Sequence, residues 1–331
     1  MPHSSSKMQD LSVISTVKMG GLAKFFFAPK NREDSILICD SLRSKSLQYI
    51  VIGNLSNSLF RSGTISTAII STKYLTQFII SNNILTCQPG VQLPAIAKYL
   101  SSIGLPNFNP LAGIPSTMGG AVVNNAGSYG TSIADLLTSI ELIDSEGNIL
   151  LLSASHLNYS WRSSLLKLMR FNFMVLSCSF NLDYLPSSPN RVLVDLALKH
   201  LTSHLAMRHA EQRSNSPNLG STFATEDLAI LLVEKKKFFK LFILFIRKLI
   251  YLSPLSKKFK AYLVNIFNKY FIWFLSGFES GLLPRLSLHN SNVFLKVNSS
   301  DSPESYFVAM QLFSSINKSL NPEINLYLDV K

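Results

Sequence analysis

The stretch AGIPSTMGGAVVNNAGSYG, residues 112–130, holds five of the fifteen glycines in the chain. Glycine tolerates positive φ angles and lets a ligand approach backbone N–H groups closely, as a pyrophosphate requires. We expect a loop, a short helix and a second loop here. A similar turn, VIGNLSN at residues 51–57, follows an apolar run at 49–53 that predicts a buried strand. Two such turns favour a dinucleotide site over ordinary tight turns, although neither has the GxGxxG or GxxxxGK[ST] pattern.

The remaining pattern predicts a folded protein of mixed helices and strands. With 331 residues, 47% of them hydrophobic, a disordered or fibrous chain is excluded, and two or three sub-domains around a shared core are expected. Apolar runs at 68–70 and 137–143 predict further strands, and the 3–4 spacing at 94–103 predicts an amphipathic helix. Pro/Ser/Asn-rich stretches flank a helical segment at 192–210 and predict a domain junction there.

The net charge of +12 is concentrated in one segment. Ten Lys and Arg residues and no acidic residue lie between Glu234 and Glu279, so the rest of the chain carries only +2. A nucleic-acid partner is therefore not expected. The segment contains a largely apolar run at 238–252 and an amphipathic run at 259–271. It is either an interfacial helix pair at a membrane surface or a hairpin packed on its own domain with its lysines in water.

Cysteine and histidine usage points away from disulfides and metals. Cys39, Cys87 and Cys178 are odd in number and form no CxxC pair, which indicates a reducing compartment. His200 and His204 lack the intervening Glu of an HExxH motif, so no metal site is expected. Residues 1–20 contain no continuous apolar run typical of a secretory signal, and a cytoplasmic location is expected.

The glycine-rich stretch resembles the flavin loop of bacterial UDP-N-acetylenolpyruvoylglucosamine reductases, GIPGTxGGAxxxNAGAYG. Further segments resemble this family in the same order along the chain. They are STVKMGGLA (15–23), IGNLSN (52–57), NYSWRSSLLK (158–167), RHAEQRSNSPNLGSTF (208–223), HNSNVFLKVN (289–298) and LYLD (326–329). Together the matches cover residues 15–225 and 277–331.

The resemblance implies an α+β protein with a two-part FAD-binding region like that of vanillyl-alcohol oxidase. That region would span residues 15–185, followed by a C-terminal α+β substrate domain at 186–331. The basic helical insertion at 235–275 has no counterpart of this length in the family. The oligomeric state does not follow from the resemblance.

By position in the family motifs, non-covalent FAD would be held by residues of the two glycine-containing stretches. These are Gly53, Asn54, Ser56, Asn57, Gly113, Ile114, Pro115, Ser116, Thr117, Gly119, Gly120, Asn125, Ala126, Gly127 and Gly130.

The implied activity is reduction of UDP-N-acetylglucosamine enolpyruvate to UDP-N-acetylmuramate. NADPH would reduce the flavin, and the flavin would pass hydride to the enolpyruvyl double bond. Arg162 would hold the carboxylate or enolate, Ser221 would donate the proton, and Asp329 would replace the family's C-terminal Glu. The product serves peptidoglycan synthesis, and through it cell-wall biogenesis, cell shape, cell division and the cell cycle.

Several positions depart from the family pattern. Leu55 replaces a Gly, which is costly if its φ angle is positive. Ser116 replaces another Gly, Trp161 a Tyr, and residues 224–226 a Lys-Asn-Pro triplet. Two alternatives therefore stay open. One is a degraded relative that binds flavin or a nucleotide sugar without turnover, and the other is a membrane-surface binding protein acting through 235–275.

Overall fold

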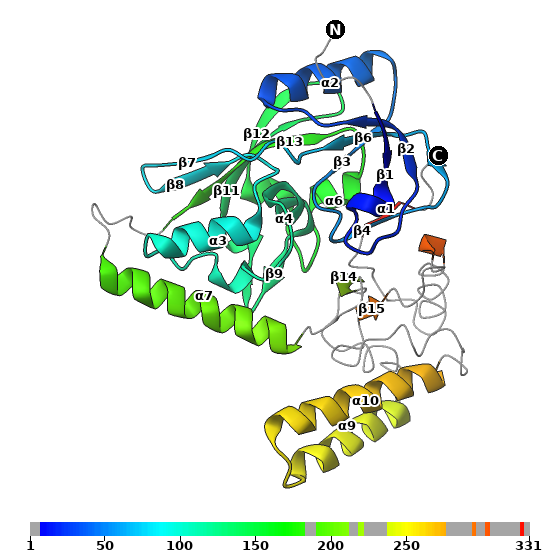
Figure 1. Cartoon of the computed structure of the whole chain (residues 1–331), viewed down its shortest axis with the longest axis vertical. Coiled ribbons are helices and arrows are strands. Elements are labelled where there is room, and N and C mark those ends of the chain that lie inside the picture. Colours follow the sequence, from blue (N-terminus) through cyan, green and yellow to red (C-terminus); the bar gives the residue numbers. More distant parts are fainter. Residues whose placement is uncertain are drawn as a thin grey trace.

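The computed structural model describes residues 7–182, 190–211, 218–221, 237–275, 293–295, 302–304 and 325–327. Two five-stranded sheets form the centre of the described chain, the first from strands within residues 7–71 and the second from strands within residues 78–181 (Figure 1).

The first sheet is mostly parallel. Its path runs β1 (Lys7–Asp10), β2 (Leu22–Phe27), β6 (Ala68–Ser71) and β3 (Tyr49–Ile52), and β5 (Thr64–Ile65) pairs with β2. Strands β2, β6 and β3 are parallel, while β1 is antiparallel to β2. Helix α2 (Arg32–Ser44) begins at Asn31, whose side chain accepts a hydrogen bond from the Asp34 amide. Its buried Ile38 and Leu42 share a core cluster with residues of both sheets.

The second sheet is antiparallel throughout. Its order is β12 (Ile149–Ser153), β11 (Leu137–Ile143), β13 (Met174–Asn181), β8 (Ile84–Cys87) and β7 (Phe78–Ser81). The largest core cluster joins this sheet to α3 (Leu93–Ser102) and α4 (Met118–Asn124). Phe108 and Phe180 are fully buried there, with their rings edge to face at 5.3 Å.

Short elements fill the connections. They are α1 (Leu11–Ile14), β4 (Ser58–Phe60), η1 (Asn109–Leu111), β9 (Gly127–Ser128), β10 (Thr131–Ser132), α5 (Ile133–Leu136), η2 (Ala154–Leu157) and α6 (Leu165–Met169).

Helix α7 (Arg191–Glu211) lies along α3 and η1 (Figure 1). Ala197 and Leu201 are buried, and the Asn109 side-chain amide donates to the Ala197 carbonyl at 2.8 Å. Since Asn109 is itself buried, this bond satisfies a polar group that would otherwise be costly inside the core. The helix thus packs on the part of the chain that carries the glycine-rich stretch.

The described C-terminal segments consist of short strands and one helical hairpin. β14 (Asn218–Ser221) pairs with β15 (Val293–Leu295), and β16 (Asn325–Tyr327) runs parallel to β4. Helices α9 (Lys237–Leu252) and α10 (Lys257–Leu275) lie side by side, apart from both large sheets (Figure 1). Within the described ranges, no helix is both long and apolar enough to cross a bilayer.

The predicted elements are largely confirmed. The strands expected at 49–53, 68–70 and 137–143 are β3, β6 and β11, and the helices expected at 94–103 and 192–210 are α3 and α7. The loop, short helix and loop expected at 112–130 are also present, with α4 at the centre. Mixed parallel and antiparallel sheets with flanking helices confirm the α+β class. The spacing of apolar residues at 305–316 also predicts a helix, but that segment lies outside the described residues.

Candidate flavin site

The turn after β3 lies directly against the start of α4. A Cβ atom at Gly53 would overlap the Oγ1 atom of Thr117. Only glycine therefore lets these two turns approach so closely without displacing Thr117. Both residues belong to the predicted cofactor set, so the fold brings together two segments that are 64 residues apart in the sequence.

Asn54 is held by a reciprocal amide pair. Its Nδ2 donates to Gln92 Oε1 at 2.5 Å, and Gln92 Nε2 donates back to Asn54 Oδ1 at 3.1 Å. The same Nδ2 also lies 3.4 Å from the Pro115 carbonyl. A third segment, preceding α3, thus fixes the geometry between the two predicted cofactor turns.

Leu55 has a left-handed backbone, with φ at +51°. The sequence analysis predicts that a leucine in place of the family's glycine destabilises this turn if its φ angle is positive, as it is here. However, the Leu55 side chain is 3% exposed and belongs to the core cluster beneath the first sheet. The Thr16 hydroxyl also donates to its carbonyl at 3.1 Å. Burial thus offsets a backbone conformation that glycine would adopt without strain.

Amides at the start of α4 bond to the protein itself. Met118 N donates to the Val91 carbonyl at 2.8 Å, and Gly119 N donates to the Pro89 carbonyl at 2.9 Å. Gly120 N lies 3.3 Å from Thr117 Oγ1 at the helix N-cap. In this structure the Gly119 N–H therefore donates to the protein itself, whereas the sequence analysis expects the glycines of this stretch to let a ligand approach backbone N–H groups. The lack of a Cβ at Gly119 serves close packing on Pro89 instead.

Asn125 ends α4 in a left-handed conformation, with φ at +46°. Its side chain is buried, donates to the Ser160 carbonyl at 2.9 Å and accepts from the Ala134 amide at 3.1 Å. Both side-chain atoms are thus engaged in holding loop 125–134 against the segment around Ser160. We expect Asn125 to shape the site rather than to contact a ligand.

Arg162 belongs to the segment around Ser160, and its side chain reaches loop 125–134. A Cβ at Gly127 would sit 3.0 Å from Arg162 Nη1, so the glycine leaves room for the guanidinium. The Arg162 backbone has φ at +55°, its Cζ lies 5.1 Å from the Trp161 ring centroid, and Lys167 Nζ donates to its carbonyl at 3.0 Å. The predicted catalytic arginine and the predicted flavin loop are therefore brought together.

A cavity of about 680 Å³, counting its open part, lies between the two sheets. Four predicted cofactor residues line it, together with two cations that the sequence analysis did not select. The four are Gly53, Thr117, Gly119 and Gly120, and the cations are Lys167 and Arg170. Lys167 lies in the motif NYSWRSSLLK, so the resemblance of this motif to the family could have identified it as a site residue. Arg170 lies just outside the motif. Glycine backbone beside two cations suits the phosphates of a dinucleotide.

Helix α7 contributes two further side chains. The Arg208 side chain fills the space where a Cβ at Gly113 would be, and the His204 ring lies 5.4 Å from that of Tyr129. Both contacts fall on the glycine-rich stretch. The sequence pattern predicted the helix but gave no sign of where it packs.

The other predicted site residues are placed only in part. The loop before α4 contains Ile114, Pro115 and Ser116, and the turns described above contain Ser56, Asn57, Ala126 and Gly130. Asn57 Nδ2 lies 3.5 Å from Asn124 Oδ1. Ser221 is the last residue of β14, in register with Val293. Asp329 lies outside the described residues, two positions beyond β16.

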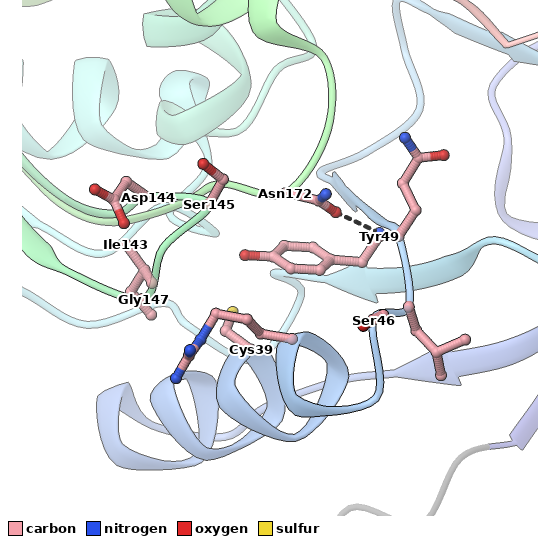
Figure 2. A pocket seen from close by; sticks show the side chains of 11 residues that line it. Cys39, Ser46, Tyr49, Ile143, Asp144, Ser145, Gly147 and Asn172 are labelled. Carbon is pink, nitrogen blue, oxygen red and sulfur yellow. Dashed lines mark hydrogen bonds between the residues drawn. The ribbon is translucent and has the colours of Figure 1, made fainter.

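A second cavity, between α2 and the β11–β12 turn, contains none of the predicted site residues (Figure 2). Its polar groups serve the fold: Asn172 accepts from the Tyr49 amide at 2.9 Å, and Asp144 accepts from the amides of Glu146 and Asn148. Burial raises the pKa of the Cys39 thiol to about 11, so this thiol is not a nucleophile near neutral pH.

Comparisons with known proteins show which proteins the chain resembles. Residues 23–153 match a family described as FAD binding domain. The chain is similar to UDP-N-acetylenolpyruvoylglucosamine reductases of Caldicellulosiruptor saccharolyticus (32% identity over 54% of this chain and 57% of the relative) and Clostridioides difficile (30% over 62% and 65%). A solved UDP-N-acetylenolpyruvylglucosamine reductase from Thermus caldophilus superposes over 98% of this chain and 99% of its own, with a TM-score of 0.66 at 18% identity.

The fold is thus of the α+β class expected, and residues 23–153, which line much of the cavity between the two sheets, match a FAD-binding domain. In sequence the chain is similar to UDP-N-acetylenolpyruvoylglucosamine reductases over about half to two thirds of its length, and in fold it is similar to the solved reductase over 98% of it. Its matches span roughly half to two thirds of the length of the curated relatives.

Proposed function

We propose that the protein is a FAD-dependent, NADPH-consuming enzyme that reduces UDP-N-acetylglucosamine enolpyruvate to UDP-N-acetylmuramate. The observation that carries this proposal is the contact of the Arg162 guanidinium with Gly127, since it joins the candidate catalytic charge to the candidate flavin loop. The named relatives support the substrate class, a nucleotide sugar.

The cofactor residues act by shape and charge. Gly53, Gly119 and Gly120 leave the cavity wall free of side chains, and Lys167 and Arg170 supply positive charge for the FAD phosphates. The bound flavin would supply hydride transfer. Asn125 and the Asn54–Gln92 pair hold the surrounding turns in fixed positions.

Arg162 would orient the substrate carboxylate and stabilise the negative charge that develops beside it. A guanidinium can bind a carboxylate through two parallel hydrogen bonds. Its position is determined by a positive φ angle, by stacking on Trp161 and by the Lys167 contact to its carbonyl. The group would thus be preorganised, which is how charge stabilisation lowers a barrier.

Ser221 would donate the proton to the substrate, and Asp329 would assist it. Ser221 follows Gly220 at the end of β14. Asp329 follows β16, which pairs with β4, the strand after the Gly53–Asn57 turn. This pairing places Asn325–Tyr327, which directly precede Leu328 and Asp329 in the sequence, beside the strand that follows the cofactor turn.

The wider proposal includes two domains and a cellular role. Residues 15–185 would bind FAD and residues 186–331 the substrate, with α7 packed on the first domain. The enzyme would act in the cytoplasm, in keeping with three buried cysteines that are free thiols, and would serve cell-wall biogenesis, cell division and cell shape.

The test separates the two half-reactions in an Arg162→Ala variant. NADPH should still bleach the flavin, because flavin reduction needs no enolate stabilisation, whereas reoxidation by the enolpyruvyl sugar should slow by about 100-fold or more. Trp161→Tyr, which restores the family residue beside Arg162, is the matched control and should keep both half-reactions. Reoxidation at the wild-type rate in Arg162→Ala would refute the assigned role.

A further inference from the structure

The helices α9 and α10 of the hairpin contact each other along one side, although Phe242 there remains 42% exposed. The Phe242 ring lies 6.3 Å from the rings of Phe267 and Phe271, and Arg247 Nη2 donates to Asn268 Oδ1 at 2.8 Å. Ile243 is fully buried. These contacts account for one side of α9 and for the pairing of the two helices.

The opposite side of α9 carries a row of exposed apolar residues, which we call the outer stripe. It consists of Leu241, Leu244, Phe245, Leu249 and Leu252, which are 44–72% exposed. Their spacing of three or four residues places them on one helical face. Beyond the turn, Leu255, Phe259 and Tyr262 are exposed as well. A helix face that water alone covers is normally polar, so this stripe indicates a contact surface.

The charge around the outer stripe has a single sign. Residues 237–275 contain eight Lys and Arg residues and no Asp or Glu. Lys248 is exposed on the same face as Leu244, Leu249 and Leu252. A long lysine side chain can extend along an apolar surface to place its ammonium group at the level of lipid phosphates.

We propose that the outer stripe binds the surface of an anionic lipid bilayer, with α9 lying in the interface. α9 has 16 residues and is therefore about 24 Å long, shorter than the ~30 Å hydrocarbon layer, and it carries charges that would oppose spanning. Apolar side chains would enter the acyl boundary while cations meet the lipid phosphates. Self-association through this face would instead bring like charges together.

This inference concerns binding, and the reaction proposed above does not depend on it. The test uses the full-length protein loaded with FAD and vesicles of phosphatidylcholine alone or mixed with phosphatidylglycerol. Cosedimentation should require phosphatidylglycerol and should weaken as salt rises from about 0.05 M to about 0.5 M, because the Debye length falls over that range.

Matched variants locate the surface. Lys248→Gln should lower the partition constant about fivefold, as expected for one cation at an anionic surface, and Leu252→Gln should lower it about tenfold. Lys98→Gln on α3 and Leu151→Gln on β12 are the controls, since Lys98 is exposed and Leu151 is 77% exposed beside 72% for Leu252. Both controls should bind as wild type does.

Equal binding to neutral and anionic vesicles would overturn the proposal, as would an equal loss in the control variants. A dimer in solution that Leu252→Gln dissociates would assign the outer stripe to a second copy instead. Lys248→Gln changes an exposed side chain only, so it decides the matter even if Leu252→Gln folds poorly. Flavin content and turnover in solution should stay unchanged in all four variants, which separates this test from that of the reaction.

Discussion

At the residue scale, two opposed energies act on Leu55: the strain of its left-handed backbone and the stabilisation from burying its side chain. A left-handed backbone costs a non-glycine residue about 1–2 kcal/mol. Removing a fully buried leucine side chain costs about 3–5 kcal/mol, including the cavity it leaves. Because Leu55 is 3% exposed, burial outweighs strain.

Leu55→Gly should therefore lower the free energy of unfolding by about 1–3 kcal/mol, although it restores the family residue and relieves the positive φ angle. Urea denaturation of variant and wild type measures this difference. A more stable variant would mean that strain exceeds packing at this turn.

Buried thiols give the protein a pH dependence. Burial raises the pKa of Cys39 to about 11 and that of Cys178 to about 12, against an ordinary value near 9. Below pH 9 these thiols are protonated in both the folded and the unfolded state, so the folded protein keeps its full free energy of unfolding. As the pH rises above 9, the unfolded thiols ionise while the folded ones do not, and the free energy of unfolding falls.

The free energy of unfolding should thus fall between pH 9 and pH 11, by up to about 1.4 kcal/mol per pH unit for each such thiol. Denaturation curves at a series of pH values measure this slope. Cys39→Ala should show a shallower slope than wild type, and equal slopes would show that Cys39 does not contribute.

At the element scale, the sequence predicted where strands and helices occur better than it predicted which elements pack or pair with one another. Apolar runs were sufficient for β3, β6 and β11, and 3–4 spacing was sufficient for α3, because most of the apolar side chains of these elements are buried. The packing of α7 on α3 could not be predicted, since it depends on contacts such as Asn109 to Ala197 that leave no local pattern. Pairing of β16 with β4 likewise joins segments more than 260 residues apart.

In the candidate site, too, local sequence patterns were predictable, whereas contacts between distant segments were not. The glycine turns were recognisable from their letters, and the positive φ of Leu55 could be stated as a condition. Arg170 was missed because it lies outside the motif and reaches the cavity only through the end of α6, where its own φ is +60°.

Lys167 and Arg170 supply the element-scale prediction. Lys167→Gln and Arg170→Gln should each weaken FAD binding roughly tenfold, because each removes a charge from the cavity wall. Quenching of flavin fluorescence during titration of flavin-free protein measures the affinity. Lys98→Gln, exposed on α3, is the control. Unchanged affinity in both variants would place the phosphates elsewhere.

At the scale of the whole molecule, the C-terminal segments return to the first domain. β16 lies beside β4, and Glu304 accepts from the amide and the hydroxyl of Ser62, each at 2.9 Å. These contacts tie Glu304 and β16, both from the C-terminal part of the chain, to the segment that follows the Gly53–Asn57 turn.

Ser221→Ala should leave flavin reduction by NADPH intact and slow reoxidation by the enolpyruvyl sugar about 100-fold or more, through loss of the proton donor. Asp329→Glu should raise turnover if the pocket has kept the family's depth, since a displacement near 1 Å can change rates about 100-fold. Stopped-flow absorbance of the two half-reactions measures both. Wild-type reoxidation in Ser221→Ala would remove that residue from the mechanism.

The central claim, that this divergent chain is a working reductase, is tested most directly on the wild-type protein without oxygen. The protein should purify yellow with non-covalent FAD, lose its flavin absorbance on addition of NADPH, and regain it on addition of UDP-N-acetylglucosamine enolpyruvate. Flavin that NADPH reduces but the enolpyruvyl sugar does not reoxidise would contradict the claim. The protein would then be a flavin-binding relative that has lost its reaction.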